Sequence, residues 1–233
     1  AVRPQGSADY ERYIGTWTVT TTSSEVTGQP QTYTIRIEPY RNDKSYKVYD
    51  WGVTTLGSKE EDFPFILSYN EADGSVGINS YEDLGMYGFT YYIYLRYRFL
   101  NEQSQPSIWV SEDTLVSGAY DAASNEITIT CGTFNDNSGI TQKITGLDYV
   151  LYTGGKYYEA QNLIRPGYLI GEGDNAKVDY GVGPYKLTKA PAAAAVPAKR
   201  PAKKFESLRP ASETKQAAAV PLGVGRLSMM SVH

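Results

Sequence analysis

Apolar and polar side chains alternate along much of this chain. Between residues 31 and 39, Tyr33, Ile35 and Ile37 occupy every second position, and polar residues stand between them. A period of two places the apolar side chains on one face of a strand whose other face meets water. Comparable runs predict about eleven strands in all, at residues 13–21, 31–39, 45–51, 63–69, 76–80, 89–100, 107–111, 115–120, 126–131, 144–153 and 182–189.

The longest predicted strand, at residues 89–100, is rich in aromatic side chains on both of its faces. One face holds Phe89, Tyr91, Ile93, Leu95, Tyr97 and Phe99, and the other holds Tyr92, Tyr94, Arg96 and Arg98. We expect the first face to line a core. The second face is expected to point outward or towards a ligand.

Turn sequences separate the predicted strands. Residues 70–74 end in Asp73-Gly74, a strong hairpin signal, and residues 121–125 form a second short link. No segment has a convincing helical period. The sequence therefore predicts an all-β fold in which an antiparallel meander closes into a barrel, with a β-sandwich as the alternative.

The chain divides into three parts by composition. Residues 10–189 hold the predicted strands and form the expected barrel domain, after a short N-terminal linker at residues 1–9. Residues 190–233 are rich in Ala, Pro and Lys without an apolar period, and we expect this tail to be disordered. Residues 154–181 contain several glycines and form either a long loop or further short strands.

Charge is divided unevenly between these parts. The tail has seven basic and two acidic residues (+5), and subtraction from the totals of 22 and 26 leaves 15 basic and 24 acidic residues in positions 1–189 (−9). An acidic domain repels phosphates, so we expect no nucleic-acid partner for it. No apolar stretch reaches the roughly 18 residues of a membrane span, so membrane contact is expected only through a lipid anchor outside this sequence.

The chemistry of the side chains excludes several classes of enzyme. The single histidine, His233, lies at the end of the tail, which leaves the domain without a histidine base or a histidine-bearing zinc site. Cys131 has no partner and is expected to be a buried apolar residue. Residues 135–139 resemble part of a calcium loop but lack its acidic series, and we expect a turn there.

These exclusions favour a protein that is not an enzyme. We expect no catalytic residue, metal or cofactor, and carboxylate chemistry of the glycosidase type is the enzymatic alternative. Aromatic side chains could instead form a stacking platform for a sugar or another flat ligand. The candidates are Trp51, Trp109, Tyr92 and Tyr94. Packing of the same side chains in the core is the competing interpretation.

Short motifs resemble those of the lipocalins and other calycins. Gly15-Thr16-Trp17 opens the first predicted strand and is similar to the Gly-x-Trp motif of that family, whose Trp plugs the closed end of the barrel. Asp148-Tyr149, followed by Tyr152, resembles the second family motif, and Arg165 stands at a plausible distance for the arginine of the third. The resemblance implies a β-barrel with a cavity.

More broadly, residues 10–189 resemble the lipocalin-like domains of uncharacterised Bacteroidetes surface lipoproteins. The opening at residues 13–19 and the Phe63-Pro64-Phe65 segment carry this likeness. The resemblance implies an exported protein at the outer surface or in the periplasm of a Gram-negative bacterium. The expected function is non-enzymatic binding of a small hydrophobic molecule or glycan, and a structural or adhesion module without a small ligand is the alternative. The oligomeric state is not predicted.

Overall fold

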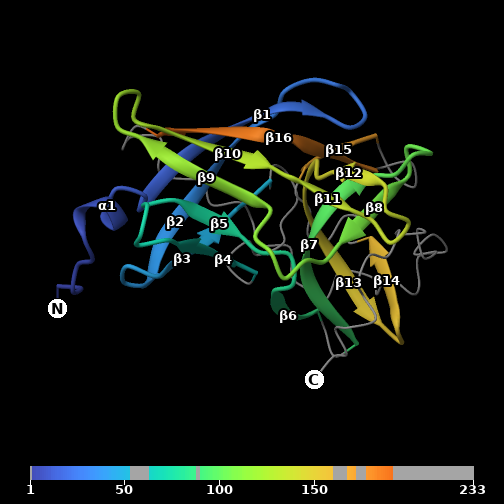
Figure 1. Cartoon of the computed structure of the whole chain (residues 1–233), viewed down its shortest axis with the longest axis horizontal. Coiled ribbons are helices and arrows are strands. Elements are labelled where there is room, and N and C mark those ends of the chain that lie inside the picture. The colour runs from blue at the N-terminus through green and yellow to red at the C-terminus, as the bar shows by residue number, and fades with distance from the viewer. Residues whose placement is uncertain (1, 53–62, 88–89, 160–166, 172–176, 191–233) are drawn as a thin grey trace.

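A closed eight-stranded antiparallel barrel dominates the structure, a computed structural model that describes residues 2–52, 63–87, 90–159, 167–171 and 177–190 (Figure 1). Each barrel strand pairs with the next, and the last pairs back with the first between Trp17 and Lys189. In order, the strands are β1 (Gly15–Ser24), β2 (Thr32–Arg41), β3 (Ser45–Tyr49), β4 (Phe65–Tyr69), β5 (Val76–Ile78), β9 (Val116–Asp121), β10 (Glu126–Cys131) and β16 (Lys177–Lys189). The predicted all-β meander closed into a barrel is confirmed.

The chain leaves the barrel twice, and the two excursions pair with each other. The first, between β5 and β9, forms β6 (Asp83–Tyr87), β7 (Tyr91–Leu100) and β8 (Pro106–Trp109). The second, between β10 and β16, forms β11 (Thr133–Asn135), β12 (Thr141–Lys143), β13 (Gly146–Thr153), β14 (Lys156–Glu159) and β15 (Gly167–Ile170). Antiparallel pairing of β7 with β13 joins β6, β7, β8, β13 and β14 into a second sheet, so the strands predicted at 89–100, 107–111 and 144–153 lie outside the barrel. The β11–β12 hairpin is a separate two-stranded sheet, and β15 pairs with β16.

The N-terminal residues cover one end of the barrel. Ser7 caps the short helix α1 (Ala8–Glu11) by accepting a hydrogen bond from the Tyr10 amide. Tyr10 stacks on Tyr46 at 4.4 Å, and the Tyr13 hydroxyl donates to the carbonyl of Gly74. Within the described residues, no helix has the length and apolarity that crossing a membrane requires.

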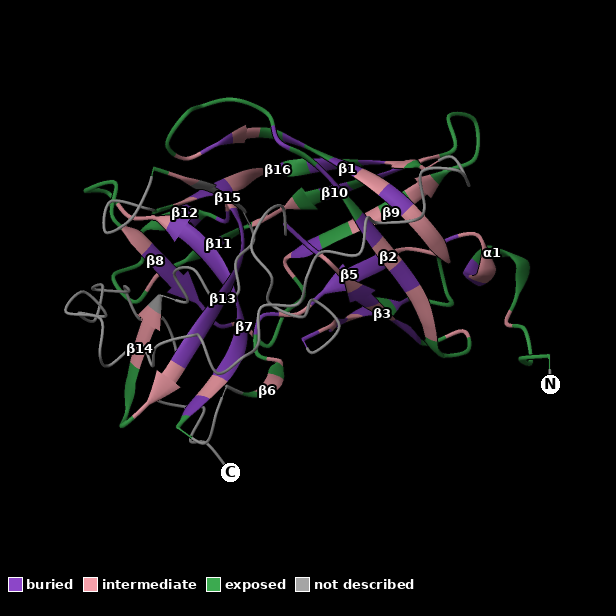
Figure 2. Cartoon of the chain, turned by 180° about the vertical axis from the view of Figure 1, so that it is seen from behind, coloured by how far each residue is buried: buried purple, intermediate pink, exposed green. Residues whose placement is uncertain are grey.

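The second sheet lies at the other end, opposite α1 (Figure 1). One continuous apolar cluster runs from Tyr10 and Trp17 through the barrel to Ile93 and Leu151 of the second sheet. Figure 2 shows buried stretches on the barrel strands and on β7 and β13. Inward-facing side chains of every barrel strand belong to it, among them Val19, Ile35, Val48, Leu67, Ile78, Val116, Ile127 and Leu187. Eight strands leave an interior that side chains can fill, and the inward-facing side chains of the described barrel strands pack together in this cluster.

Both faces of β7 are buried. Ile93, Leu95 and Tyr97 face the main core as expected, whereas Tyr94 packs with Ile108 and Val150 in a second, smaller cluster on the opposite face. The expected outward position of the second face is therefore wrong for Tyr94, Arg96 and Arg98, which are all buried. The sequence could not show this because the strands that flank β7 come from two distant segments.

A buried ion-pair network fastens the second sheet to the barrel. Arg98 of β7 binds Asp148 of β13 at 2.7 Å and Glu25, directly after β1, at 2.9 Å. Its guanidinium also lies 3.5 Å from the ring centre of Tyr180 in β16. Burial by itself would lower the pKa of Arg98, but the carboxylate of Asp148 and that of Glu25 outweigh it and hold this pKa well above its ordinary value.

Candidate ligand-binding site

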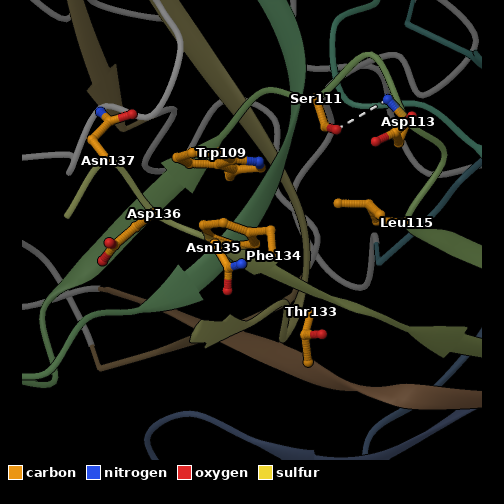
Figure 3. Close-up of a pocket in the computed structure, with 9 residues that line it drawn as sticks. All are labelled: Trp109, Ser111, Asp113, Leu115, Thr133, Phe134, Asn135, Asp136 and Asn137. Carbon is orange, nitrogen blue, oxygen red and sulfur yellow. Dashed lines mark hydrogen bonds between the residues drawn. The ribbon is translucent and has the colours of Figure 1, made fainter. Parts of the chain in front are cut away.

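A pocket of about 320 Å³ opens where β8 meets the β11–β12 hairpin (Figure 3). Its apolar lining consists of Trp109, Leu115 and Phe134. Its polar lining consists of Ser111, Asp113, Thr133, Asn135, Asp136 and Asn137. The residues come from two sides: Trp109 to Leu115 belong to β8 and the connection to β9, and the rest belong to the hairpin.

Two stacked aromatic rings form the apolar part of this pocket. Trp109 and Phe134 are nearly parallel, with centroids 4.1 Å apart and an interplanar angle of 17°. Phe99 meets Phe134 edge-on at 4.9 Å, which connects the pair to the main core. Trp109 is only 6% exposed, so its position is fixed by packing and little of its ring remains open to a ligand.

The hairpin turn holds the polar side of the pocket in one conformation. Asp136 Oδ1 accepts hydrogen bonds from the amides of Ser138 and Ile140, both at 2.9 Å. Its Oδ2 accepts from the side-chain amide of Gln142 at 3.0 Å. Gly139 adopts φ +79°, a conformation that favours glycine. Residues 135–139 therefore form the turn that the sequence predicts, between two short strands that it did not predict.

The pocket is acidic. The side-chain hydrogen bond from Gln142, with the amides of Ile140 and Ser138, lowers the pKa of Asp136, so this carboxyl stays ionised at neutral pH. Asp113 contributes a second, exposed carboxylate, and its amide is held by the Ser111 hydroxyl at 3.0 Å. No lysine or arginine is among the described residues that line the pocket.

Asp136 does not have the raised pKa of a glycosidase general acid. A general acid needs a raised pKa so that it carries a proton near neutral pH, whereas that of Asp136 is lowered. Among the described residues, no group of three or more His, Cys, Asp or Glu side chains could hold a metal ion.

The four predicted platform residues do not lie together. Trp109 lines the pocket, but Trp51 packs in the barrel core, where its ring meets Tyr185 at 4.9 Å and Phe65 at 5.9 Å. Tyr92 and Tyr94 belong to the smaller cluster on the far face of β7. The role of each in ligand binding stays a prediction, and only Trp109 borders the pocket described above.

Tyr92 and Tyr94 belong to a tyrosine-rich face of the second sheet. Their rings are parallel at 6.2 Å, and the Arg96 guanidinium lies 4.4 Å from the Tyr94 ring. Arg96 donates to the carbonyls of Ser80 and Leu95, at 3.2 and 2.9 Å. Burial raises the pKa of Tyr94 to about 12, so its hydroxyl stays protonated.

The Gly-x-Trp motif occupies the α1 end of the barrel. Trp17 is fully buried, and its indole Nε1 donates to the carbonyl of Tyr13 at 2.8 Å. The Lys189 ammonium lies 4.6 Å over the Trp17 ring and donates to the carbonyl of Ile14. Gly15 has φ +135°, a backbone conformation that favours glycine, and a Cβ there would displace only the flexible end of the Lys189 side chain.

The second motif lies in the second sheet, away from the Gly-x-Trp motif. Asp148 and Tyr149 are buried in β13, where Asp148 is a partner of Arg98. Burial raises the pKa of Tyr149 far above its ordinary value. Arg165, Phe89 and the tail at 191–233 lie outside the described residues.

Sequence reasoning missed Phe134 and the two strands that flank the turn. Thr133-Phe134-Asn135 and Thr141-Gln142-Lys143 each alternate for only three residues, too short for a periodic signal. Their symmetric placement around the turn at 135–139 was the available indication of a hairpin.

Sequence reasoning also missed Glu82. Both of its carboxylate oxygens accept the Ile66 amide, at 2.9 and 3.1 Å, and burial raises its pKa to about 7.

No family model, curated protein or solved structure matches this chain.

Proposed function

We propose that the Trp109–Phe134 pocket binds a glycan and that this chain is a non-enzymatic sugar-binding domain. The observation that carries the proposal is the lining of the pocket. The small exposed parts of the Trp109–Phe134 pair, with Leu115, form its apolar part, and six hydroxyl, amide and carboxylate side chains form its larger polar part. A sugar presents an apolar face and several hydroxyl groups, and such a lining offers contacts to both.

A hydrophobic ligand inside the barrel has less support. The interior positions are occupied by the packed side chains of the main cluster, including Trp51 against Phe65 and Tyr185. The second sheet belongs to the same cluster at the end of the barrel opposite α1. A fatty acid or haem-like molecule would have to displace this core, whereas a glycan in the pocket displaces only water.

The proposal also covers the location of the protein in the cell. The closed barrel, with Trp17 buried beneath Lys189 at its α1 end, supports the likeness to lipocalin-like domains of Bacteroidetes surface lipoproteins. We place the chain accordingly at the outer surface or in the periplasm of a Gram-negative bacterium, held to the membrane by a lipid anchor.

A glycan array followed by calorimetry tests the proposal. For a glycan that binds, Thr133→Val removes one exposed hydroxyl from the pocket and keeps the shape of the side chain. Loss of one hydrogen bond, about 0.5–1.5 kcal/mol, should weaken binding roughly two- to twelvefold. Thr128→Val is the matched control, since Thr128 is also exposed on a strand (β10) but lies outside the pocket lining.

Two outcomes would overturn the glycan assignment. One is an array on which no glycan binds the folded protein. The other is a binding glycan whose affinity responds equally to Thr133→Val and Thr128→Val, which would place its site elsewhere. Binding of fatty acids without glycan binding would support a ligand site inside the barrel instead.

A further inference from the structure

We infer that the pocket selects uncharged and amino sugars and rejects glycans that carry carboxylate or sulfate groups. This inference rests on the proposed glycan function and adds the chemical class of the ligand. It follows from the charges on the pocket wall, which are fixed by the fold.

The negative charge of Asp136 cannot be removed easily. Three hydrogen bonds, from the Ser138 and Ile140 amides and the Gln142 side chain, favour its ionised form. They also restrict its rotation, so the charge stays at the pocket when a ligand arrives. An anionic sugar would have to bring its own charge beside this one.

Asp113 adds a second carboxylate from the opposite wall, on the connection between β8 and β9 (Figure 3). None of the described lining residues is basic, so nothing in the wall offsets the two acids. Lys143 pairs with Thr133 across the hairpin and lies outside the lining. The net charge of −9 over residues 1–189 adds to the repulsion.

The polar groups that remain suit hydroxyl, acetamido and ammonium groups. The Asn135 side chain offers N–H donors, while its Oδ1 accepts from the Thr141 hydroxyl. The hydroxyls of Thr133 and Ser111 can donate, although Ser111 Oγ already accepts from the Asp113 amide. The two carboxylates accept hydrogen bonds only. They therefore match the hydroxyls of a neutral sugar or the ammonium of an amino sugar, and not a uronate.

The experiment compares matched pairs of glycans that differ only in charge. Galactotriose and trigalacturonate form one pair, and lactose and 3′-sulfolactose form another, alongside the best array hit and its acidic counterpart. We expect the neutral member to bind at least about tenfold more tightly in 0.05 M salt. The ratio should shrink in 0.5 M salt, because ions screen exposed charges at these distances.

Two variants assign the selectivity to the pocket. Asp113→Asn keeps the size of the side chain and removes one charge. The ratio of the affinity for the neutral glycan to that for the acidic glycan should fall by threefold or more. Glu112→Gln is the matched control, since Glu112 is the adjacent exposed acid and lies outside the lining. It should leave the ratio unchanged.

The outcomes separate the two proposals. Acidic glycans that bind as tightly as their neutral counterparts would overturn the selectivity and leave the glycan function standing. Equal effects of Asp113→Asn and Glu112→Gln would assign the selectivity to the general charge of the protein and overturn the role of the pocket. Failure of all glycans to bind would overturn both.

Discussion

The ion pair at Arg98 should contribute more to stability than any surface pair, and Arg98→Met tests this. The side chain of Arg98 is 3% exposed, and those of its partners Asp148 and Glu25 are 0% and 9% exposed. Nε donates to both Glu25 oxygens at 2.9 and 3.1 Å, Nη2 donates to Oε1 at 2.9 Å, and Nη1 donates to Asp148 at 2.7 Å. Methionine fills similar volume but leaves two buried carboxylates without this cation.

Removing one partner of a buried pair typically costs about 3–5 kcal/mol, because the remaining charge is desolvated and uncompensated. Urea unfolding followed by tryptophan fluorescence measures the loss in the free energy of unfolding. For a domain of this size, a loss of that magnitude corresponds to a fall in the melting temperature of roughly 6–20 °C. Adding Glu25→Gln to Arg98→Met should recover part of the loss, since it removes one of the stranded charges.

Lys186→Met is the control, because Lys186 pairs with Glu126 on the barrel surface and its side chain is 59% exposed. Exposed pairs contribute below about 1 kcal/mol. If Arg98→Met destabilised the protein no more than Lys186→Met does, the view that this network fastens the second sheet to the barrel would be wrong.

Three further predictions concern buried polar groups. Burial raises the pKa of Glu82 to about 7, so the folded state binds a proton that the unfolded state loses near pH 4.5, and stability should fall as pH rises from 4.5 through 7. In Glu82→Gln, the fall in the free energy of unfolding over this pH range should be about 2 kcal/mol smaller than in the wild type, a figure reduced for solvent screening of the half-buried group. Identical curves of unfolding free energy against pH for the two proteins would refute the prediction. Cys131 is half-buried, not fully buried as expected, and this burial still raises the pKa of its thiol to about 12. Iodoacetamide at pH 8 should therefore alkylate the folded protein at least about a hundredfold more slowly than the urea-unfolded chain, and equal rates would contradict the raised pKa. Tyr13→Phe removes a hydroxyl that donates to the carbonyl of Gly74 and accepts from the Tyr120 amide. Thermal unfolding should show that the free energy of unfolding falls by about 1–3 kcal/mol. An unchanged melting temperature would contradict this prediction.

The strands of the barrel could be predicted because their signal is local. Alternation in residues 31–39 and the Asp73-Gly74 turn between β4 and β5 each specify a strand or hairpin within a few residues. The closure of β1 on β16 and the pairing of β7 with β13 could not be predicted in the same way. They pair residues 48 or more positions apart (Arg98 with Gly146 is the shortest separation), and nothing in one segment specifies the register of the other.

The candidate site shows the same limit. Trp109 could be selected from the sequence as one of four aromatic residues able to stack on a flat ligand, and it lines the pocket. Trp51 had the same appearance but packs in the core, since exposure depends on partners that the sequence does not bring together. Phe134 was missed because its strand is three residues long.

The central claim, that a glycan binds at Trp109 and not inside the barrel, is tested most directly by the three indole N–H signals in an NMR titration. Each tryptophan reports a different region: Trp17 lies at the α1 end, Trp51 in the barrel core and Trp109 at the pocket. With the best array hit, the account predicts that the Trp109 signal shifts in a saturable manner while those of Trp17 and Trp51 stay in place. A saturable shift of Trp51 with Trp109 unmoved would place the ligand inside the barrel and contradict the account.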